Sequence, residues 1–267
     1  MSLQIIKYSR LFSILVFINI ALCAACSPAQ SEDIAQPQSQ TAQRVNAQQY
    51  SSFWIWGNIS SAAYLHHAKE LYILQGEMNW DRTKRTPVFI PQGIGILQKP
   101  QQKIWLVIRS HHLNWSEANV EMVIQRLQQW KNASNQIQGL QIDFDAKTQN
   151  LQQYAVFLQN IRRQLPQEYR LSITGLMDWT NIKNPNTLTL LRQNIDEIAI
   201  QTYRGSTTIT NYSAYLAKVA QLQLPYKIGL VQHGQWQAPK YLAQDPNFKG
   251  YVVFLLRSKP ETIPQNN

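Results

Sequence analysis

The stretch Gly139-Leu140-Gln141-Ile142-Asp143-Phe144-Asp145 decides the fold of this chain of 267 residues. It is typical of an apolar β-strand that ends in two acidic side chains separated by one residue. Because residues i and i+2 of a strand point to the same side, we expect Asp143 and Asp145 to lie together, about 6.5–7 Å apart along the backbone. Parallel barrels and doubly wound sheets carry their active sites at such strand ends. Two carboxylates there push their pKa values apart, which prepares acid–base chemistry, whereas a surface acid pair capping the next helix is the alternative.

Further apolar runs, rich in Ile, Val, Leu and aromatic residues, alternate with helical patterns along the rest of the chain. Their weak alternation is typical of strands that are covered on both faces. The predicted strands are residues 53–56, 71–78, 104–109, 137–143, 170–176, 195–202, 226–231 and 251–256. Helical apolar stripes are predicted over 117–131 after the N-cap Ser116, over 151–161 before Pro166, and over 212–222.

This β-then-α order predicts an α/β fold, a small (β/α)₈ TIM-type barrel. The barrel is near the lower size limit of about 200 residues, so some of its helices must be short or missing. An open α/β sheet is the alternative, but the chain has no Gly-x-Gly-x-x-Gly or Walker loop that would cradle a phosphate.

Residues 1–26 are typical of a lipoprotein signal peptide. Lys7 and Arg10 precede an apolar run over 11–22, and Cys23-Ala24-Ala25-Cys26 places small residues directly before Cys26. We therefore expect Cys26 to become the lipidated first residue, carrying acyl chains such as palmitate, and Ser27 to permit sorting to the outer membrane, facing the periplasm of a bacterial envelope. A transmembrane anchor is the alternative, but the run is shorter than the ~20 residues that a span needs. No other Cys is present, so Cys23 and Cys26 do not indicate a metal or redox motif.

Residues 27–50, rich in Gln, Ser, Ala and Pro, are predicted to be a disordered, flexible tether because they cannot bury enough apolar surface to offset their ordering entropy. The barrel domain is expected over 51–258 and a C-terminal tail over 259–267. The formal net charge is +10, and removal of Lys7 and Arg10 with the signal leaves +8. The basic residues are scattered, which favours an anionic envelope surface or acidic glycan over nucleic acid as a partner.

Polar and aromatic residues gather at the predicted C-terminal strand ends. They are Trp56, Glu77, Arg109, His111, Asp143, Asp145, Asp178, Trp179, Gln201, Tyr203, His233 and Arg257. Acids and amides bond hydroxyl groups while aromatic faces cover a sugar ring, so this set predicts a carbohydrate site. Core-edge roles for the tryptophans, and capping or Arg-pairing roles for Glu77 and Asp178, are the alternatives. No metal, cofactor or serine nucleophile is expected, because metal-ligand spacing and a Gly-x-Ser-x-Gly elbow are missing from the sequence.

The stretch 138–145 resembles the fourth strand of the family 18 (chitinase-like) glycoside hydrolases, which ends in Asp-Gly-Ile-Asp-Ile-Asp-Trp-Glu or close variants. The glycine, the apolar positions, Asp143 and an aromatic residue agree, whereas Gln138 and Gln141 replace two acids and Asp145 replaces the catalytic Glu. The stretch 200–203, Ile-Gln-Thr-Tyr, is similar to the family's Met-x-Tyr, whose Tyr supports the reacting acetamido group. Because Asp is one methylene shorter than Glu, misplacement of that size could cost about 10²-fold in rate.

Over nearly all of the mature domain the chain resembles an uncharacterised bacterial family, domain of unknown function 3142. The similar positions are 139–145, Tyr154, Leu165-Pro166, 171–174 and Trp179. This resemblance implies a sugar-hydrolase-like barrel without an assigned substrate.

Two functions are therefore expected. The first is an envelope-anchored glycoside hydrolase that acts on an N-acetylated or other cell-envelope polysaccharide, with Asp145 protonating the leaving oxygen and Asp143 orienting it or steadying the oxocarbenium-like centre. Its substrate-binding residues would be Trp56, Glu77, Arg109, Asp178, Trp179, Gln201, Tyr203 and His233. The second is a non-catalytic glycan-binding or scaffolding lipoprotein. In both, the partners are a carbohydrate and, through Cys26, the membrane.

Overall fold

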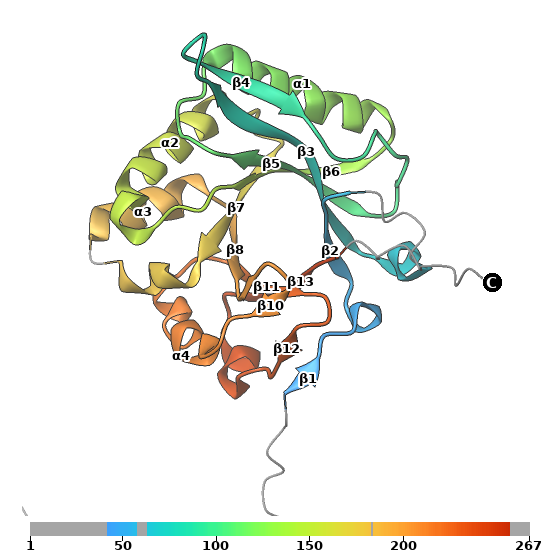
Figure 1. The fold of residues 1–267 in the computed structure, drawn as a ribbon, viewed down its shortest axis with the longest axis vertical. Coiled ribbons are helices and arrows are strands. Elements are labelled where there is room, and N and C mark those ends of the chain that lie inside the picture. The colour runs from blue at the N-terminus through green and yellow to red at the C-terminus, as the bar shows by residue number, and fades with distance from the viewer. Residues whose placement is uncertain (1–41, 58–62, 183, 257–267) are drawn as a thin grey trace, which may run out of the picture. The chain divides into compact units, whose positions relative to one another are not determined.

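The computed structural model describes residues 42–57, 63–182 and 184–256. Within these residues, eight parallel strands close into a barrel in the order β2-β13-β11-β8-β7-β6-β5-β3, with β3 paired back to β2 (Figure 1). The strands are β2 (Ser52–Ile55), β3 (Glu70–Asp81), β5 (Lys103–Ser110), β6 (Gln136–Asp143), β7 (Arg170–Leu176), β8 (Glu197–Gln201), β11 (Tyr226–Val231) and β13 (Phe248–Phe254). The predicted small TIM-type barrel is confirmed.

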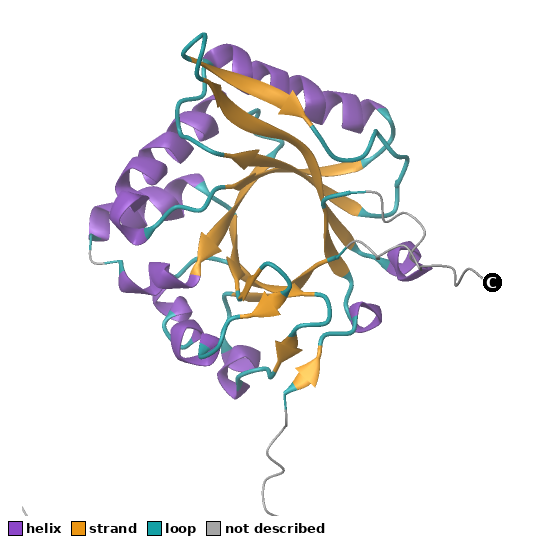
Figure 2. Cartoon of the chain, in the orientation of Figure 1, coloured by secondary structure: helices purple, strands orange, loops and turns teal. Residues whose placement is uncertain are grey.

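The α-helices cover only part of the barrel wall (Figure 2). They are α1 (Glu117–Asn132) after β5, α2 (Leu151–Gln164) after β6, α3 (Pro185–Asn194) after β7 and α4 (Tyr212–Leu216) after β8. In the described residues, β2–β3 and β11–β13 are connected through 3₁₀ turns, η2 (Ala63–His67) and η6 (Lys240–Gln244). The predicted helix over 212–222 is divided into α4 and the 3₁₀ turn η5 (Val219–Leu222).

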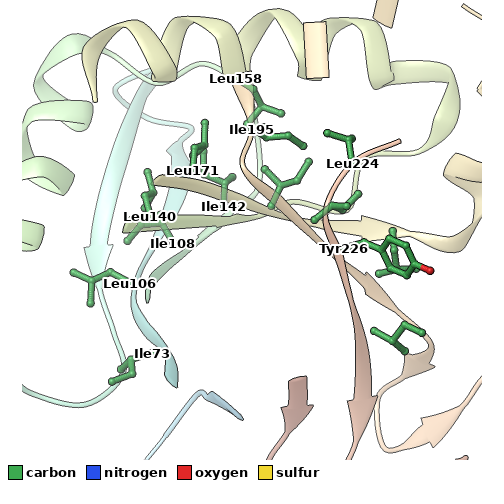
Figure 3. Close-up of a cluster of buried hydrophobic side chains, with 14 of the residues drawn as sticks. Ile73, Leu106, Ile108, Leu140, Ile142, Leu158, Leu171, Ile195, Leu224 and Tyr226 are labelled. Atoms are coloured by element: carbon green, nitrogen blue, oxygen red, sulfur yellow. The ribbon is translucent and has the colours of Figure 1, made fainter. Parts of the chain in front are cut away.

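Two apolar layers hold the barrel together. Alternate strand residues point outward and pack under the helices, as Leu140, Ile142 and Leu171 do near Leu158 of α2 (Figure 3). The other residues point inward and fill the centre of the barrel: Trp54, Tyr72, Leu74, Trp105, Val107, Ala199 and Val252. The rings of Tyr72 and Trp105 stack with an interplanar angle of 2°. The barrel is therefore a packed core and not a pore, as is usual for this architecture.

Two β-bulges decide which residues face the interior. Between β5 and β6, the register passes from Ile104↔Ile137 to Trp105↔Gly139, so Gln138 is an extra residue. Between β3 and β5, it passes from Leu74↔Val107 to Gly76↔Ile108, so Gln75 is extra. Because side chains alternate along a strand, each extra residue shifts the following ones to the other face. Glu77 and Asp143 consequently face the interior.

Gly139 makes the β6 bulge possible. Its φ is +158°, and a Cβ at this position would lie 1.9 Å from the carbonyl oxygen of Arg170 on β7. No side chain fits at that distance, so the backbones of β6 and β7 approach each other only at a glycine.

Short strands extend the barrel outside the closed wall. β4 (Thr86–Pro91) pairs antiparallel with the C-terminal half of β3, from Gly76 to Asp81. β1 (Gln43–Arg44) pairs with β12 (Gln235–Trp236), and β9 (Tyr203–Arg204) pairs with β10 (Thr207–Thr208).

The first described residues belong to the folded domain, although the sequence places them in the tether. Residues 43–49 form β1 and the 3₁₀ turn η1 (Ala47–Gln49), and Val45 and Ala47 are each 2% exposed. The domain therefore begins before residue 51. The predicted signal peptide with Cys26, most of the tether and the tail over 259–267 lie outside the described residues. Within the described part of the chain, no helix is both long and apolar enough to cross a bilayer.

Candidate functional site

Asp143 is the last residue of β6, and its side chain points into the C-terminal end of the barrel. The residue is 5% exposed, and its Oδ1 accepts a hydrogen bond from Thr174 Oγ1 on β7 at 2.8 Å. Burial raises the pKa of Asp143 from 3.8 to about 6. The Thr174 hydrogen bond opposes this rise, the charge of Asp145 adds to it, and the charges of Arg109 and His111 oppose it. Asp143 therefore keeps a proton to a higher pH than an ordinary aspartic acid.

Asp145 lies two residues further along, beyond the end of β6, in a different environment. The residue is exposed, and its carboxyl group has neither a hydrogen bond nor an ion pair with any described residue. Its charge acts on Asp143, so the two carboxyl groups form an electrostatically coupled pair. The predicted acid pair thus consists of one buried and one exposed member, the kind of difference that separates an acid from a base.

Charged residues from neighbouring strands surround the acid pair. Arg109 of β5 is opposite Asp143 in the β5–β6 register, and Glu77 of β3 is opposite Arg109. The Arg109 guanidinium lies 5.2 Å from the ring centroid of Trp56. His111 Nε2 lies 3.3 Å from Glu77 Oε2. These four predicted residues come from β3, β5 and the segments just after β2 and β5, and they meet because all these strands end at one rim.

Aromatic side chains complete the group. The Tyr203 ring stacks on Phe254 of β13 with centroids 5.8 Å apart, and Phe254 meets Trp56 edge-on at 5.5 Å. Burial raises the pKa of the Tyr203 hydroxyl well above its ordinary value, and the charges of Asp143 and Asp145 add to the rise. Tyr203 therefore stays protonated and can donate a hydrogen bond. We call Trp56, Glu77, Arg109, His111, Asp143, Asp145, Tyr203 and Phe254 the mouth cluster.

Two members of this region were missed in the sequence. Phe254 is an aromatic residue near a predicted strand end, so its position was a usable signal. Tyr154 lies on the apolar stripe of α2, and nothing in that pattern distinguishes it from a core residue. It is fully buried, its hydroxyl has no hydrogen-bond partner among the described residues, and burial, followed by the charges of Asp143 and Asp145, raises its pKa.

The remaining predicted residues differ in where the structure places them. Gln201 lies two residues from each of the inward residues Ala199 and Tyr203. Because residues two apart in a strand point to the same side, it also faces the barrel interior. His233 is exposed in the turn after β11 with a φ of +67°, and its backbone N–H donates to the carbonyl of Val45. Arg257 lies outside the described residues.

Asp178 and Trp179 have structural roles in the 3₁₀ turn η4 (Met177–Asn181) that follows β7. Asp178 Oδ2 accepts hydrogen bonds from the backbone N–H and the hydroxyl of Thr148, at 3.2 and 2.9 Å. Trp179 is 1% exposed, and its Nε1 donates to the carbonyl of Ala146 at 2.6 Å. A ring with both faces covered by protein offers no platform for a sugar, so we leave Trp179 out of the proposed site.

Gln141 replaces one acid of the family 18 pattern, and its contacts explain why an amide fits. The residue is completely buried at the barrel centre. Its Oε1 accepts from Trp54 Nε1 at 2.6 Å, and its Nε2 donates to Ser172 Oγ at 2.9 Å. A carboxylate could not donate the second bond, whereas the amide satisfies both partners without burying a charge. Among the described residues, no three His, Cys, Asp or Glu side chains gather as a metal site.

Residues 109–224 match the family described as "Domain of unknown function (DUF3142)". No protein with a curated description matches the chain. The Bacillus cereus spore cortex-lytic enzyme SleL is similar in structure with a TM-score of 0.41 and 15% identity, over 67% of this chain and 49% of that chain. This chain thus spans about half the length of SleL.

Two other solved structures are similarly distant. The chitinase domain of the spore coat protein CotE from Clostridium difficile has a TM-score of 0.44 and 11% identity, over 76% of this chain and 68% of that chain. The xylanase and alpha-amylase inhibitor protein XAIP-II from Scadoxus multiflorus has a TM-score of 0.47 and 15% identity, over 76% and 92%. We draw no activity from similarities this remote. The stretch around Asp143 lies inside the segment that matches this family model.

Proposed function

We propose that this protein is a glycoside hydrolase that acts on a cell-envelope polysaccharide by carboxylate acid–base catalysis. The observation that carries the proposal is the coupled acid pair at the end of β6. Asp143 is buried with a pKa raised to about 6, whereas Asp145 is exposed and has no partner among the described residues. Two carboxyl groups in contrasting environments at a C-terminal strand end are the arrangement that acid–base catalysis on a barrel requires.

In the proposed reaction, Asp145 protonates the leaving glycosidic oxygen because it is the member of the pair that solvent and substrate can reach. Asp143 orients the proton donor, and only in its ionised form would it also steady the oxocarbenium-like centre that develops at the sugar. Because burial raises the pKa of Asp143 to about 6, Asp143 loses its proton as the pH rises through that range, and we expect turnover to fall there.

The aromatic part of the mouth cluster binds the sugar. Trp56, Tyr203 and Phe254 present rings that can cover the apolar face of a pyranose, and Arg109, Glu77 and His111 bond its hydroxyl groups. The protonated Tyr203 hydroxyl donates to a ring substituent, for which an acetamido carbonyl is a suitable acceptor. If the acetamido group is the nucleophile, no second protein carboxylate is needed, so an N-acetylated glycan is the favoured substrate.

A non-catalytic glycan-binding or scaffolding role is the second candidate, and one observation favours it. Asp143 is only 5% exposed and is bound to Thr174, so its contribution could be to the packing of the barrel alone. In either role, the proposed location is the bacterial outer membrane, with a lipid anchor on Cys26 and the domain facing the periplasm. That location rests on the signal pattern of residues 1–26.

The experiment is a turnover assay of the full-length protein on N-acetylated glycans, peptidoglycan fragments and exopolysaccharides. It compares Asp143→Asn and Asp145→Asn with Glu121→Gln, which removes an acid from the exposed face of α1. We expect the control to retain activity and Asp145→Asn to lose about 10²–10⁴-fold in kcat/KM. Turnover that survives both aspartate substitutions would refute the assignment. Binding of a glycan without turnover on any substrate would favour the second candidate.

A further inference from the structure

A cavity of about 850 Å³ lies at the N-terminal end of the barrel, at the opposite end of the strands from the acid pair. The first residues of successive strands line it, together with the segments that lead into them: Ser52, Glu70, Lys103, Gln136, Arg170, Glu197 and Lys227. Its volume is within the range of about 300–1,000 Å³ that is usual for small-ligand sites. The proposed catalysis uses none of these residues.

Buried charges at the base of this cavity are already paired. Lys227 Nζ donates to Glu70 Oε2 and, at 2.9 Å, to the hydroxyl of Tyr72, and it lies 3.7 Å from Glu197 Oε2. The Tyr72 hydroxyl donates to Glu197 Oε1 at 2.7 Å, and Trp105 Nε1 donates to Glu70 Oε1 at 2.7 Å. Both acids of the cavity are therefore engaged by Lys227 and by neutral donors.

The cations at the rim of the cavity are not balanced in this way. Lys69 and Lys103 are exposed, and neither forms an ion pair with any described residue. Arg170 has a distant acid contact, with Asp196 at 4.0 Å, and its charge also acts on Glu197. Lys249 donates to the carbonyl of Pro246. The five basic residues of the lining, Lys69, Lys103, Arg170, Lys227 and Lys249, face two acids, Glu70 and Glu197, which leaves a charge of +3 before His66 and His67 are counted.

A structural role accounts for the paired charges at the base of the cavity, but it does not account for the lysines at its rim. In the β3–β5 register the residue opposite Lys103 is Glu70, whose carboxylate is already bound by Lys227 and by Trp105 Nε1. Lys69 directly precedes Glu70 and, like Lys103, forms no ion pair with a described acid. A concave wall with a net positive charge concentrates anions from solution, and a bound anion would balance these lysines.

We infer that this cavity binds an acidic saccharide, through a carboxylate or phosphate group carried on the sugar. The rim cations bind the anionic group. The amides of Gln101, Gln102 and Gln136 and the hydroxyls of Ser51 and Ser52 provide donors and acceptors for the sugar hydroxyls. The hollow shape and this uncharged polar lining fit a discrete sugar better than a flat bilayer surface. The site is independent of the acid pair and of whether the protein cleaves glycans.

The test is a calorimetric titration of the full-length protein with tetragalacturonate, glucose 6-phosphate, inorganic phosphate and, as a neutral counterpart, maltotetraose. The test variant is Lys69→Gln with Lys103→Gln. The matched control is Lys218→Gln with Lys240→Gln, which removes two exposed lysines that do not line the cavity. Arg170→Gln is a second test variant, and a thermal melt verifies the folding of each protein.

We expect the wild type and the control pair to bind at least one acidic sugar equally well and maltotetraose not at all. The test variant should bind that sugar at least about tenfold more weakly, and raising the salt from about 50 to about 500 mM should weaken binding by the wild type. Tetragalacturonate and glucose 6-phosphate distinguish carboxylate from phosphate as the recognised group.

Four outcomes would overturn the inference. The first is equal loss of binding in the control pair, which would indicate unspecific charge attraction. The second is binding of inorganic phosphate as tight as that of any sugar. The third is binding only to anionic phospholipid vesicles, titrated as a further probe, which would identify a membrane-facing surface. The fourth is failure of every probe to bind.

Discussion

Thr174 on β7 donates its hydroxyl hydrogen to Asp143 Oδ1 on β6, at 2.8 Å, inside the barrel wall. The same hydroxyl oxygen accepts the backbone N–H of Phe144 at 3.3 Å, so Thr174 also holds the backbone between the two acids. The bond favours the charged form of Asp143, whereas burial favours the neutral form. The pKa of about 6 reflects the balance of these effects, and burial is the larger.

Asp143→Asn should change how stability depends on pH. The folded-state pKa is raised from 3.8 to about 6, so the folded protein holds this proton more tightly than the unfolded chain does. The free energy of unfolding therefore falls as the pH rises through this window, by at most about 3 kcal/mol, and does not recover above it. Asn stays neutral, so urea unfolding should show the variant roughly 1–3 kcal/mol more stable than the wild type near pH 8 and similar to it near pH 4. An unchanged difference at the two pH values would contradict the burial argument.

Thr174→Val should raise the pKa of Asp143 further, because it removes the hydrogen bond that stabilises the carboxylate. The direct measurement is a carboxyl carbon NMR titration of Asp143. We expect a destabilisation of about 1–2 kcal/mol from the lost bonds to Asp143 and Phe144. Thr189→Val on the exposed face of α3 is the control, since among the described residues its hydroxyl bonds the carbonyl of Pro185 alone. A downward shift would mean that Thr174 does not donate to Asp143.

Gly139→Ala should destabilise the protein by more than about 3 kcal/mol, because a Cβ there would lie 1.9 Å from the Arg170 carbonyl oxygen. Backbone atoms cannot move aside without separating β6 from β7. Gly95→Ala is the matched control, since no atom lies within 4 Å of its added Cβ. Thermal unfolding of both variants measures the difference, and equal melting temperatures would show that the β6 bulge tolerates a side chain.

Lys227→Met should also be strongly destabilising, by about 3–5 kcal/mol, because it leaves Glu70 and Glu197 in the barrel without their cation. Burial already raises the pKa of Glu197, and loss of the lysine should raise it more. Stability of the variant should therefore improve at acidic pH, where Glu197 is protonated. Lys218→Met at an exposed position is the control in denaturant unfolding. A loss below about 1 kcal/mol would show that the buried network is not structural.

The strands of the barrel could be predicted because each is an apolar run buried on both faces. For β7 and β11 the predicted and observed limits coincide. α1 and α2 could be predicted from their apolar stripes and from Ser116 and Pro166. α3 was missed because it buries only Thr187, Leu191 and Asn194, which do not form a recognisable stripe. β4 was missed because its pairing is with one neighbour only and because Pro87 and Pro91 argue against a strand.

The candidate site was predictable where a residue sits at a predicted strand end, as Asp143, Arg109 and Glu77 do. It was not predictable for Asp178 and Trp179, because the chain turns into η4 directly after β7 and directs the indole into the core. The bulged residues Gln75 and Gln138 each precede a glycine, which is a bulge signal inside a strand pattern but does not by itself fix the register. The bulges decide which face Glu77 and Asp143 occupy.

The layer of Trp54, Tyr72 and Trp105 across the middle of the barrel has a further consequence. It separates the rim that carries the acid pair from the hollow at the other end by a block of closely packed rings. A lineage of such proteins could therefore lose or exchange its chemistry at one end and still conserve recognition at the other. Each end is a separate unit on which selection can act, and a single shared frame supports both.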